Sequence, residues 1–137
     1  MRANFYVCVV SLGLLAAAAP VFAHHSFSAE YDATKPVTLT GTVSKVEWMN
    51  PHARFELDVK DDTGKVTTWD LELGSPNVLM RLGWNRHSLK VGDVVTVQGS
   101  LAKDGSKLAN ARKVTLADGR KVFAGSAADA DKTNPAP

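Results

Sequence analysis

Apolar residues recur at every second position from Pro36 onward, which is the period of a β-strand with one buried face. The alternation slips by one residue after Val43 and resumes at Val46. A β-bulge at Ser44 or Lys45 accounts for this slip, because a bulge adds one residue to the strand and bends it. The pattern therefore predicts a long, curved first strand that begins at Pro36.

The next stretch has the pattern of a β-hairpin. Residues 53–60 alternate between apolar and charged positions, residues 61–64 form a turn sequence, and residues 65–73 alternate again. Asp70 and Glu72 are expected on the outer side of the second strand, where alternating surface charge is usual. The expected inward positions are Ala53, Phe55, Leu57, Val59, Trp69, Leu71 and Leu73.

A short helix is predicted after the hairpin. Ser75 is a favourable N-cap, Pro76 suits the first helical position, and Gly83 is expected to end the helix. Leu79 and Leu82 are expected on the side that closes one end of the fold. Three further strands are predicted at residues 94–99, 108–116 and 121–123.

The predicted elements follow the order strand, strand, strand, helix, strand and strand, with a bulge in the first strand. This is the layout of the oligonucleotide/oligosaccharide-binding (OB) barrel. We therefore expect an all-β domain over residues 36–124: a small OB-like five-stranded barrel with a short helix between strands 3 and 4. Residues 125–137 are dominated by Ala, Asp, Ser, Pro and Gly without apolar periodicity, which predicts a disordered tail.

The amino end has the three parts of a secretory signal peptide, which we assign to residues 1–23. Arg2 provides the positive start, residues 5–19 are mostly apolar, and small residues lead up to a cleavage point after Ala23. Cleavage removes Cys8, the only cysteine, so the mature chain has no thiol for a disulfide or a cysteine metal site. We expect a periplasmic or secreted protein in which residues 24–35 form an N-terminal arm.

The charge balance and the length of the apolar stretch bear on the partners to expect. The chain has 16 basic and 14 acidic residues, and loss of Arg2 with the signal leaves a net charge of about +1. Nucleic-acid binding rewards a strongly basic balance, so we expect no nucleic-acid partner. The apolar stretch is shorter than the roughly 20 residues of a bilayer-spanning helix, so we expect no membrane span after cleavage. The expected partners are a small ligand, a metal ion or an envelope protein.

Three histidines suggest a transition-metal site. Cleavage after Ala23 would leave His24 and His25 at the new amino end, so that a free α-amine and two imidazoles lie within two residues. Nitrogen ligands suit copper and nickel, which makes copper the first candidate. His52 is expected at the rim of the barrel and could complete the set. The alternative is that His24 and His25 form a solvated end while His52 caps a strand; His87, the fourth histidine, is interpreted as a loop residue.

Aromatic residues suggest a second, metal-free hypothesis, in which a groove binds a glycan, a peptide or an envelope protein. Trp48 and Trp84 lie at the ends of predicted elements, where an indole can either pack or stack on a ligand. Asn50 lies in the same predicted loop as Trp48 and is a candidate polar contact. No sequence motif for a catalytic site is present, so no catalytic residue is assigned, and a copper enzyme is a third hypothesis.

Several short motifs together resemble one protein family. They are His24-His25-Ser26-Phe27, Tyr31-Asp32, Gly41-Thr42-Val43, Trp48-Met49-Asn50-Pro51-His52, Gly83-Trp84, Leu89-Lys90-Val91-Gly92-Asp93 and Asp118-Gly119-Arg120. This set resembles an uncharacterised exported bacterial family, domain of unknown function 6152, over nearly the whole mature chain. The resemblance implies export and a small β domain, and it implies no activity or substrate. It also groups His24, His25 and His52 as parts of the family's motif.

Overall fold

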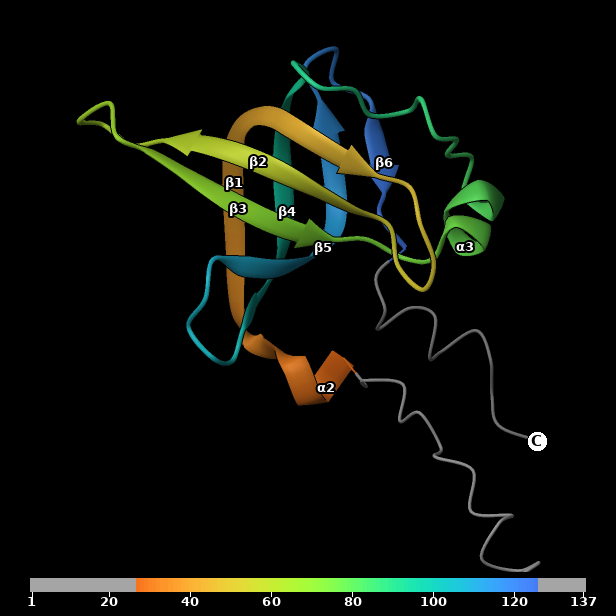
Figure 1. Cartoon of the computed structure of the whole chain (residues 1–137), viewed down its shortest axis with the longest axis horizontal. Coiled ribbons are helices and arrows are strands. Elements are labelled where there is room, and N and C mark those ends of the chain that lie inside the picture. Colours follow the sequence, from red (N-terminus) through yellow and green to blue (C-terminus); the bar gives the residue numbers. More distant parts are fainter. Residues whose placement is uncertain (1–26, 126–137) are drawn as a thin grey trace, which may run out of the picture.

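The computed structural model describes residues 27–125. The predicted signal peptide, His24, His25 and the predicted tail beyond Gly125 lie outside the described residues. The elements, in chain order, are α2 (Phe27–Glu30), β1 (Tyr31–Glu47), β2 (Arg54–Lys60), β3 (Val66–Glu72), α3 (Pro76–Arg81), β4 (Val94–Ala102), β5 (Leu108–Leu116) and β6 (Lys121–Phe123). Figure 1 shows the strands wrapped around a common interior, with α3 at one end and α2 beside the start of β1.

The strands form an OB-like fold, as the order of elements predicted. They are hydrogen-bonded in the order β3-β2-β1-β4-β5-β6, and an additional parallel pairing between β3 and β5 closes the first five into a ring. β6 pairs only with β5 and forms the terminal hairpin that the sequence indicated. The short helix α3 lies between the third and fourth strands, which confirms its predicted place.

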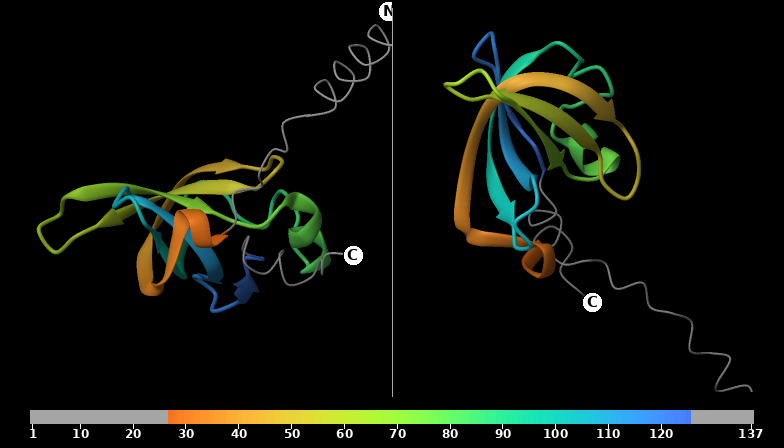
Figure 2. Two further views of the ribbon diagram at one scale, coloured as in Figure 1. Left: turned by 90° about the horizontal axis from the view of Figure 1, so that it is seen from below. Right: turned by 60° about the vertical axis from the view of Figure 1, so that its left-hand side comes forward.

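The first strand is longer than the alternation indicated. The register between β1 and β2 shifts between Val43 and Lys45, which confirms the predicted bulge. Figure 2 shows the result: β1 runs along one side of the barrel and then arches over its end. However, β1 begins at Tyr31 and not at Pro36. The segment between these two residues was missed because its side chains are polar or exposed and show no alternation.

The barrel interior holds the apolar side chains that the alternation placed inward on β2, together with those of β1, β4 and β5. Helix α3 closes one end through Leu79, which is fully buried. Ser75 caps the helix as expected, since its side-chain oxygen accepts a hydrogen bond from the Val78 amide at 3.4 Å. The expectation that Leu82 also faces inward is wrong: Leu82 is 47% exposed because it is the C-cap and lies beyond the last helical residue.

The close pairing of β1 with β2 depends on the absence of a side chain at Gly41. A Cβ atom at this position would lie 2.3 Å from the Asp58 carbonyl oxygen of β2, so the strands would have to separate. We predict that Gly41→Ala lowers the free energy of unfolding by about 1 to 3 kcal/mol, as overpacking commonly does. Urea denaturation measures this loss. Thr40→Ala, at the exposed neighbouring position, is the control and should cost less; equal losses would contradict the explanation.

Candidate functional site

A layer of polar side chains is buried on the outer side of the barrel. Glu72, Ser100 and Asn110 are 5%, 2% and 0% exposed, and they are the buried polar residues of the described chain. Asn110 pairs with Glu72 across β5 and β3, and with Ser100 across β5 and β4. Directly paired residues project from the same side of a sheet. We call these three residues the polar layer.

Tyr31 lies beside Glu72, one member of the polar layer. Its side chain is 1% exposed, and its hydroxyl lies buried beside the Glu72 carboxylate without a well-aligned hydrogen bond. Burial raises the pKa of Tyr31 well above its ordinary value, and the negative charges of Glu72 and Glu30 raise it further. The expectation that Glu72 is a solvent-facing charge was therefore wrong. Glu72 does point outward from the barrel, but Tyr31 lies over it.

His52 is held by Glu72. Its Nδ1 lies 3.0 Å from Glu72 Oε1, and the imidazole keeps 29% of its surface exposed. The hydrogen bond with Glu72 raises the pKa of His52 above its ordinary value, although partial burial acts in the opposite direction. With Nδ1 engaged by the carboxylate, Nε2 is the nitrogen left for an external partner.

Arg54 holds the second oxygen of Glu72 and fixes Asp70. Its guanidinium donates to Asp70 Oδ1 at 3.1 Å and to Asp70 Oδ2 at 2.8 Å, and it reaches Glu72 Oε2 at 3.5 Å. Burial pushes the pKa of Glu72 upward, but the hydrogen bond and charge of His52, with Tyr31 and Arg54, outweigh it and lower the pKa. Glu72 is therefore a buried carboxylate that stays ionised.

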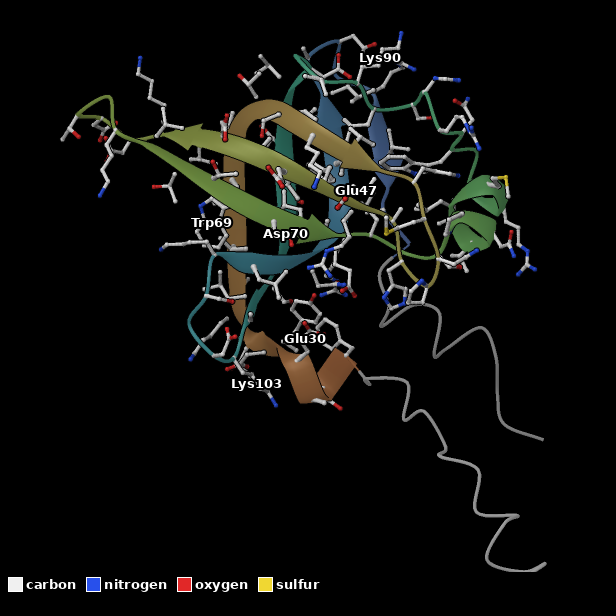
Figure 3. The ribbon with its side chains drawn as sticks, in the orientation of Figure 1. Glu30, Glu47, Trp69, Asp70, Lys90 and Lys103 are labelled. Atoms are coloured by element: carbon white, nitrogen blue, oxygen red, sulfur yellow. The ribbon has the colours of Figure 1, made fainter. Side chains whose placement is uncertain are left out.

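The segment before Pro36 is tied to the barrel through Lys103 and Tyr31. The Lys103 amide donates to the Glu30 carbonyl at 2.9 Å, and Lys103 Nζ donates to the Ser28 carbonyl at 2.5 Å. Phe27 stacks on Tyr31 with ring centroids 5.6 Å apart. Figure 3 shows Glu30 and Lys103 together at the junction of α2 with β1.

Tyr31 is the main apolar anchor of this segment, because α2 has no buried residue and residues 33–36 are exposed. The Tyr31 ring is therefore the apolar contact that holds this segment against the barrel.

The other predicted site residues lie in different environments. Trp84 is 4% exposed and belongs to the core, and it borders a small cleft together with Trp48 and Leu73. Trp48 is half-buried and packs against the same core. Asn50 is exposed and precedes a cis peptide bond to Pro51, in the loop that ends at His52. The two tryptophans of the metal-free hypothesis thus lie at one cleft, which has a volume of about 10 Å³.

The described residues were also compared with the expected metal site and with the position of His87. Within residues 27–125, no three His, Cys, Asp or Glu side chains are arranged to hold a metal ion. His52 would therefore need ligands from outside this range. His87 lies elsewhere, in a shallow hollow of about 490 Å³ between the loop before β4 and the β5–β6 turn, together with Lys90 and Arg120.

A model of a family of unknown function, DUF6152, matches residues 11–111. The chain belongs to this family. No curated protein shows significant sequence similarity to the chain. In the described part of the chain, no helix is both long enough and apolar enough to cross a membrane.

Two solved structures with similar folds bear on the expected partners. One is the mitochondrial single-stranded DNA binding protein Rim1 of S. cerevisiae, at 12% identity and a TM-score of 0.48, covering 61% of this chain and 94% of that chain. The other is the N-terminal domain of PriB from Thermoanaerobacter tencongensis, at 18% identity and a TM-score of 0.42, covering 61% and 96%. Rim1 contradicts our exclusion of nucleic acid, because a protein of similar fold is a DNA-binding protein. Net charge was not a sufficient ground for that exclusion, and the likeness itself shows the fold alone.

The pairing of His52 with Glu72 should make stability depend on pH. The pKa of Glu72 is lowered in the folded protein. The stability that its ionised carboxylate contributes is therefore fully present above pH 4.5, the ordinary pKa, and is lost as the pH falls through the lowered pKa. The pKa of His52 is raised in the folded protein. The stability that its protonated imidazole contributes is therefore fully present below pH 6.5, the ordinary pKa, and is lost as the pH rises through the raised pKa. The two windows overlap between pH 4.5 and pH 6.5.

We predict that Glu72→Gln lowers the free energy of unfolding by about 1 to 3 kcal/mol, most strongly in that overlap. Urea denaturation across the acid and neutral range measures the difference. Glu56→Gln is the matched control, because Glu56 lies on the same face with the exposed partner Lys45 at 3.6 Å and should cost less than about 1 kcal/mol. A Glu72→Gln effect that did not vary with pH would contradict the pairing.

Proposed function

We propose that this protein is an exported OB-like binding protein that holds a transition-metal ion, with Cu(II) as the first candidate. The proposed ligands are His52 on the barrel and, from the mature amino end, the α-amine and imidazoles of His24 and His25. Signal cleavage after Ala23 is part of the proposal, since it creates the amine. The ion would lie outside the polar layer, where His52 reaches the surface.

The observation that carries the proposal is the hydrogen bond between His52 Nδ1 and Glu72 Oε1. Metal-binding histidines usually donate their second ring nitrogen to a carboxylate or a carbonyl, which fixes the ring and raises the basicity of the ligating nitrogen. Glu72 is itself fixed by Arg54. His52 is thus oriented, partly exposed and ready to offer Nε2, which distinguishes it from an ordinary solvated histidine.

The position of α2 supports the reach of the remaining ligands. Phe27 stacks on Tyr31, and Tyr31 lies beside the carboxylate that holds His52. His25 precedes Phe27 by two residues, so its Cα lies within about 7 Å of the Phe27 Cα. Glu30 also lies close enough to act on His52 electrostatically, and its negative charge favours a cation nearby.

The donor set suits copper. Imidazole and amine nitrogens bind Cu(II) in preference to calcium or magnesium, which take oxygen ligands. Imidazole titrates near neutral pH, so a metal ion can displace its proton under physiological conditions. The carboxylates of Glu72 and Asp70 remain paired with His52 and Arg54 and would act around the ion rather than on it.

The first test is titration of the exported protein with Cu(II), followed by calorimetry and the visible d–d band. The mature amino end would first be established by intact mass. We predict one saturable site at micromolar Cu(II), weakened at least about tenfold by His52→Ala through loss of one ligand. His87→Ala is the matched control, because His87 is an exposed histidine in a separate loop, and it should bind as the native protein does.

A second variant tests the amine. One alanine inserted before His24 moves the α-amine away from the first imidazole and should weaken binding, while the barrel stays folded. No saturable site in the native protein, or equal effects of His52→Ala and His87→Ala, would refute the proposal. Binding unchanged by the inserted alanine would remove the amine from the ligand set.

Glu72 gives a further prediction for the same titration. Glu72→Gln removes the charge that orients His52 and makes it more basic, so Cu(II) affinity should fall by about 10- to 100-fold. The effect should be absent when His52 is already alanine, because Glu72 acts through His52. A full additional loss in the double variant would contradict this role.

A further inference from the structure

We propose that the hollow between the loop before β4 (residues 83–93) and the β5–β6 turn (residues 117–120) binds a small organic anion through a carboxylate or phosphate group. The hollow has a volume of about 490 Å³, and its polar lining includes His87, Lys90, Asp93, Asp118 and Arg120. Figure 1 shows both loops at one end of the barrel, and Figure 3 labels Lys90 at that end and Glu30 at the other. We call this surface the anion hollow; its lining includes no residue of the polar layer or of the proposed metal site.

Basic side chains reach the anion hollow from two separate loops. His87 and Lys90 come from the loop before β4, and Arg120 comes from the β5–β6 turn. All three are exposed, so they are accessible to a ligand. Ammonium and guanidinium groups bind carboxylate and phosphate through charge-assisted hydrogen bonds, and the planar guanidinium can hold two oxygens at once. The hollow therefore brings together the side chains that recognise such a group.

The two carboxylates of the anion hollow are held by the chain itself. Asp93 Oδ2 accepts a hydrogen bond from the Lys90 amide at 2.9 Å. Asp118 Oδ1 accepts from the Arg120 amide at 2.9 Å, and Asp118 Oδ2 accepts from Arg120 Nε. The guanidinium of Arg120 carries further N–H groups on its terminal nitrogens. The charges of Lys90 and Arg120 offset those of the two carboxylates, so the hollow selects a ligand by its donors rather than by an excess of charge.

The neutral side chains of the hollow add donors in the same way. Asn85 Oδ1 accepts a hydrogen bond from the His87 amide at 2.8 Å, and Ser88 Oγ accepts one from the Asn85 amide at 2.9 Å. With these oxygens engaged, the Asn85 amide nitrogen and the Ser88 hydroxyl proton are the groups that face a ligand as donors. A ligand group that only accepts hydrogen bonds, such as a carboxylate or a phosphate, is the complement of this lining.

Backbone hydrogen bonds hold both loops in place. The Val43 amide of β1 donates to the Asp93 carbonyl at 2.9 Å, and the Gly92 amide donates to the Val43 carbonyl at 2.8 Å. The β5–β6 turn is closed by the bond from the Leu116 amide to the Arg120 carbonyl at 2.9 Å. A surface whose backbone is ordered before binding pays less conformational entropy when the ligand arrives.

The size of the anion hollow favours an organic molecule over a bare inorganic ion. Small-molecule sites commonly have volumes of roughly 300 to 1,000 Å³, and the volume of about 490 Å³ lies within that range. Val94, which is 51% exposed, and Leu116 also line the hollow and offer apolar contact to the carbon part of a ligand. Because the basic groups are exposed to solvent, we expect only millimolar affinity.

NMR titration of the exported protein at constant ionic strength tests the proposal. The probes are glycerate, glycerol 3-phosphate and glycerol, which share a three-carbon skeleton and differ in their acidic group. The backbone amides of Ser88 and Ala117 report on the anion hollow, and the Asn110 amide reports on the polar layer. We expect saturable shifts at Ser88 and Ala117 with an anionic probe, no saturable shift with glycerol, and no shift at Asn110.

Paired variants separate the hollow from general surface charge. Lys90→Gln with Arg120→Gln should weaken binding of the anionic probe at least about tenfold, because two charge-assisted contacts are lost and two carboxylates remain. Lys65→Gln with Arg112→Gln is the matched control: it removes the same charge from exposed positions outside the hollow and should stay within about twofold of the native affinity. Either hollow substitution alone should give part of the loss, which keeps the test usable should the paired variant fail to fold.

The probes also assign the acidic group. Saturation by glycerate alone supports a carboxylate ligand, saturation by glycerol 3-phosphate alone supports a phosphate ligand, and saturation by both supports recognition of either group. Absence of saturable shifts at Ser88 and Ala117 would overturn the proposal. Equal binding of glycerol, or equal losses in the two paired variants, would overturn it as well.

Discussion

The buried carboxylate of Glu72 is the constraint on which the site depends. An ionised carboxylate that loses contact with water must be compensated by partners, or it becomes neutral. Here the partners come from the start of β2, where His52 takes one oxygen and Arg54 approaches the other. Tyr31 is buried beside the same carboxylate. One charge thereby connects the barrel, the loop before β2 and the segment before β1.

This arrangement requires the closure of the barrel. β3 and β5 are far apart in sequence, and their parallel pairing places Asn110 directly beside Glu72. β4 adds Ser100 on the other side of Asn110. The polar layer therefore exists only after the ring of strands has formed, and Tyr31 can lie beside Glu72 only because β1 extends back past Pro36 along β4.

The sequence predicted the barrel better than the site for a physical reason. Alternation of apolar and polar residues reports which side of a strand faces the core, so β2, β5, β6 and the bulge in β1 followed from it. It also placed Glu72 correctly on the outer side. It could not show that the outer side is covered, because covering depends on Tyr31, which lies in a polar segment without periodicity. The burial of Trp84 was equally hard to predict, because an aromatic residue in a loop gives no periodic signal and its 4% exposure follows from the tertiary packing of the core.

Under the proposed function, export and metal binding are linked by covalent chemistry. The α-amine of His24 does not exist as an amine while residues 1–23 are attached, because its nitrogen is then part of a peptide bond. A precursor still bearing its signal would offer only imidazoles, and the chelate formed by amine and ring would be missing. Cleavage would create that chelate three residues before Phe27, whose ring stacks on Tyr31. Under this proposal, the metal site would therefore be completed only by the bond cleavage that accompanies export.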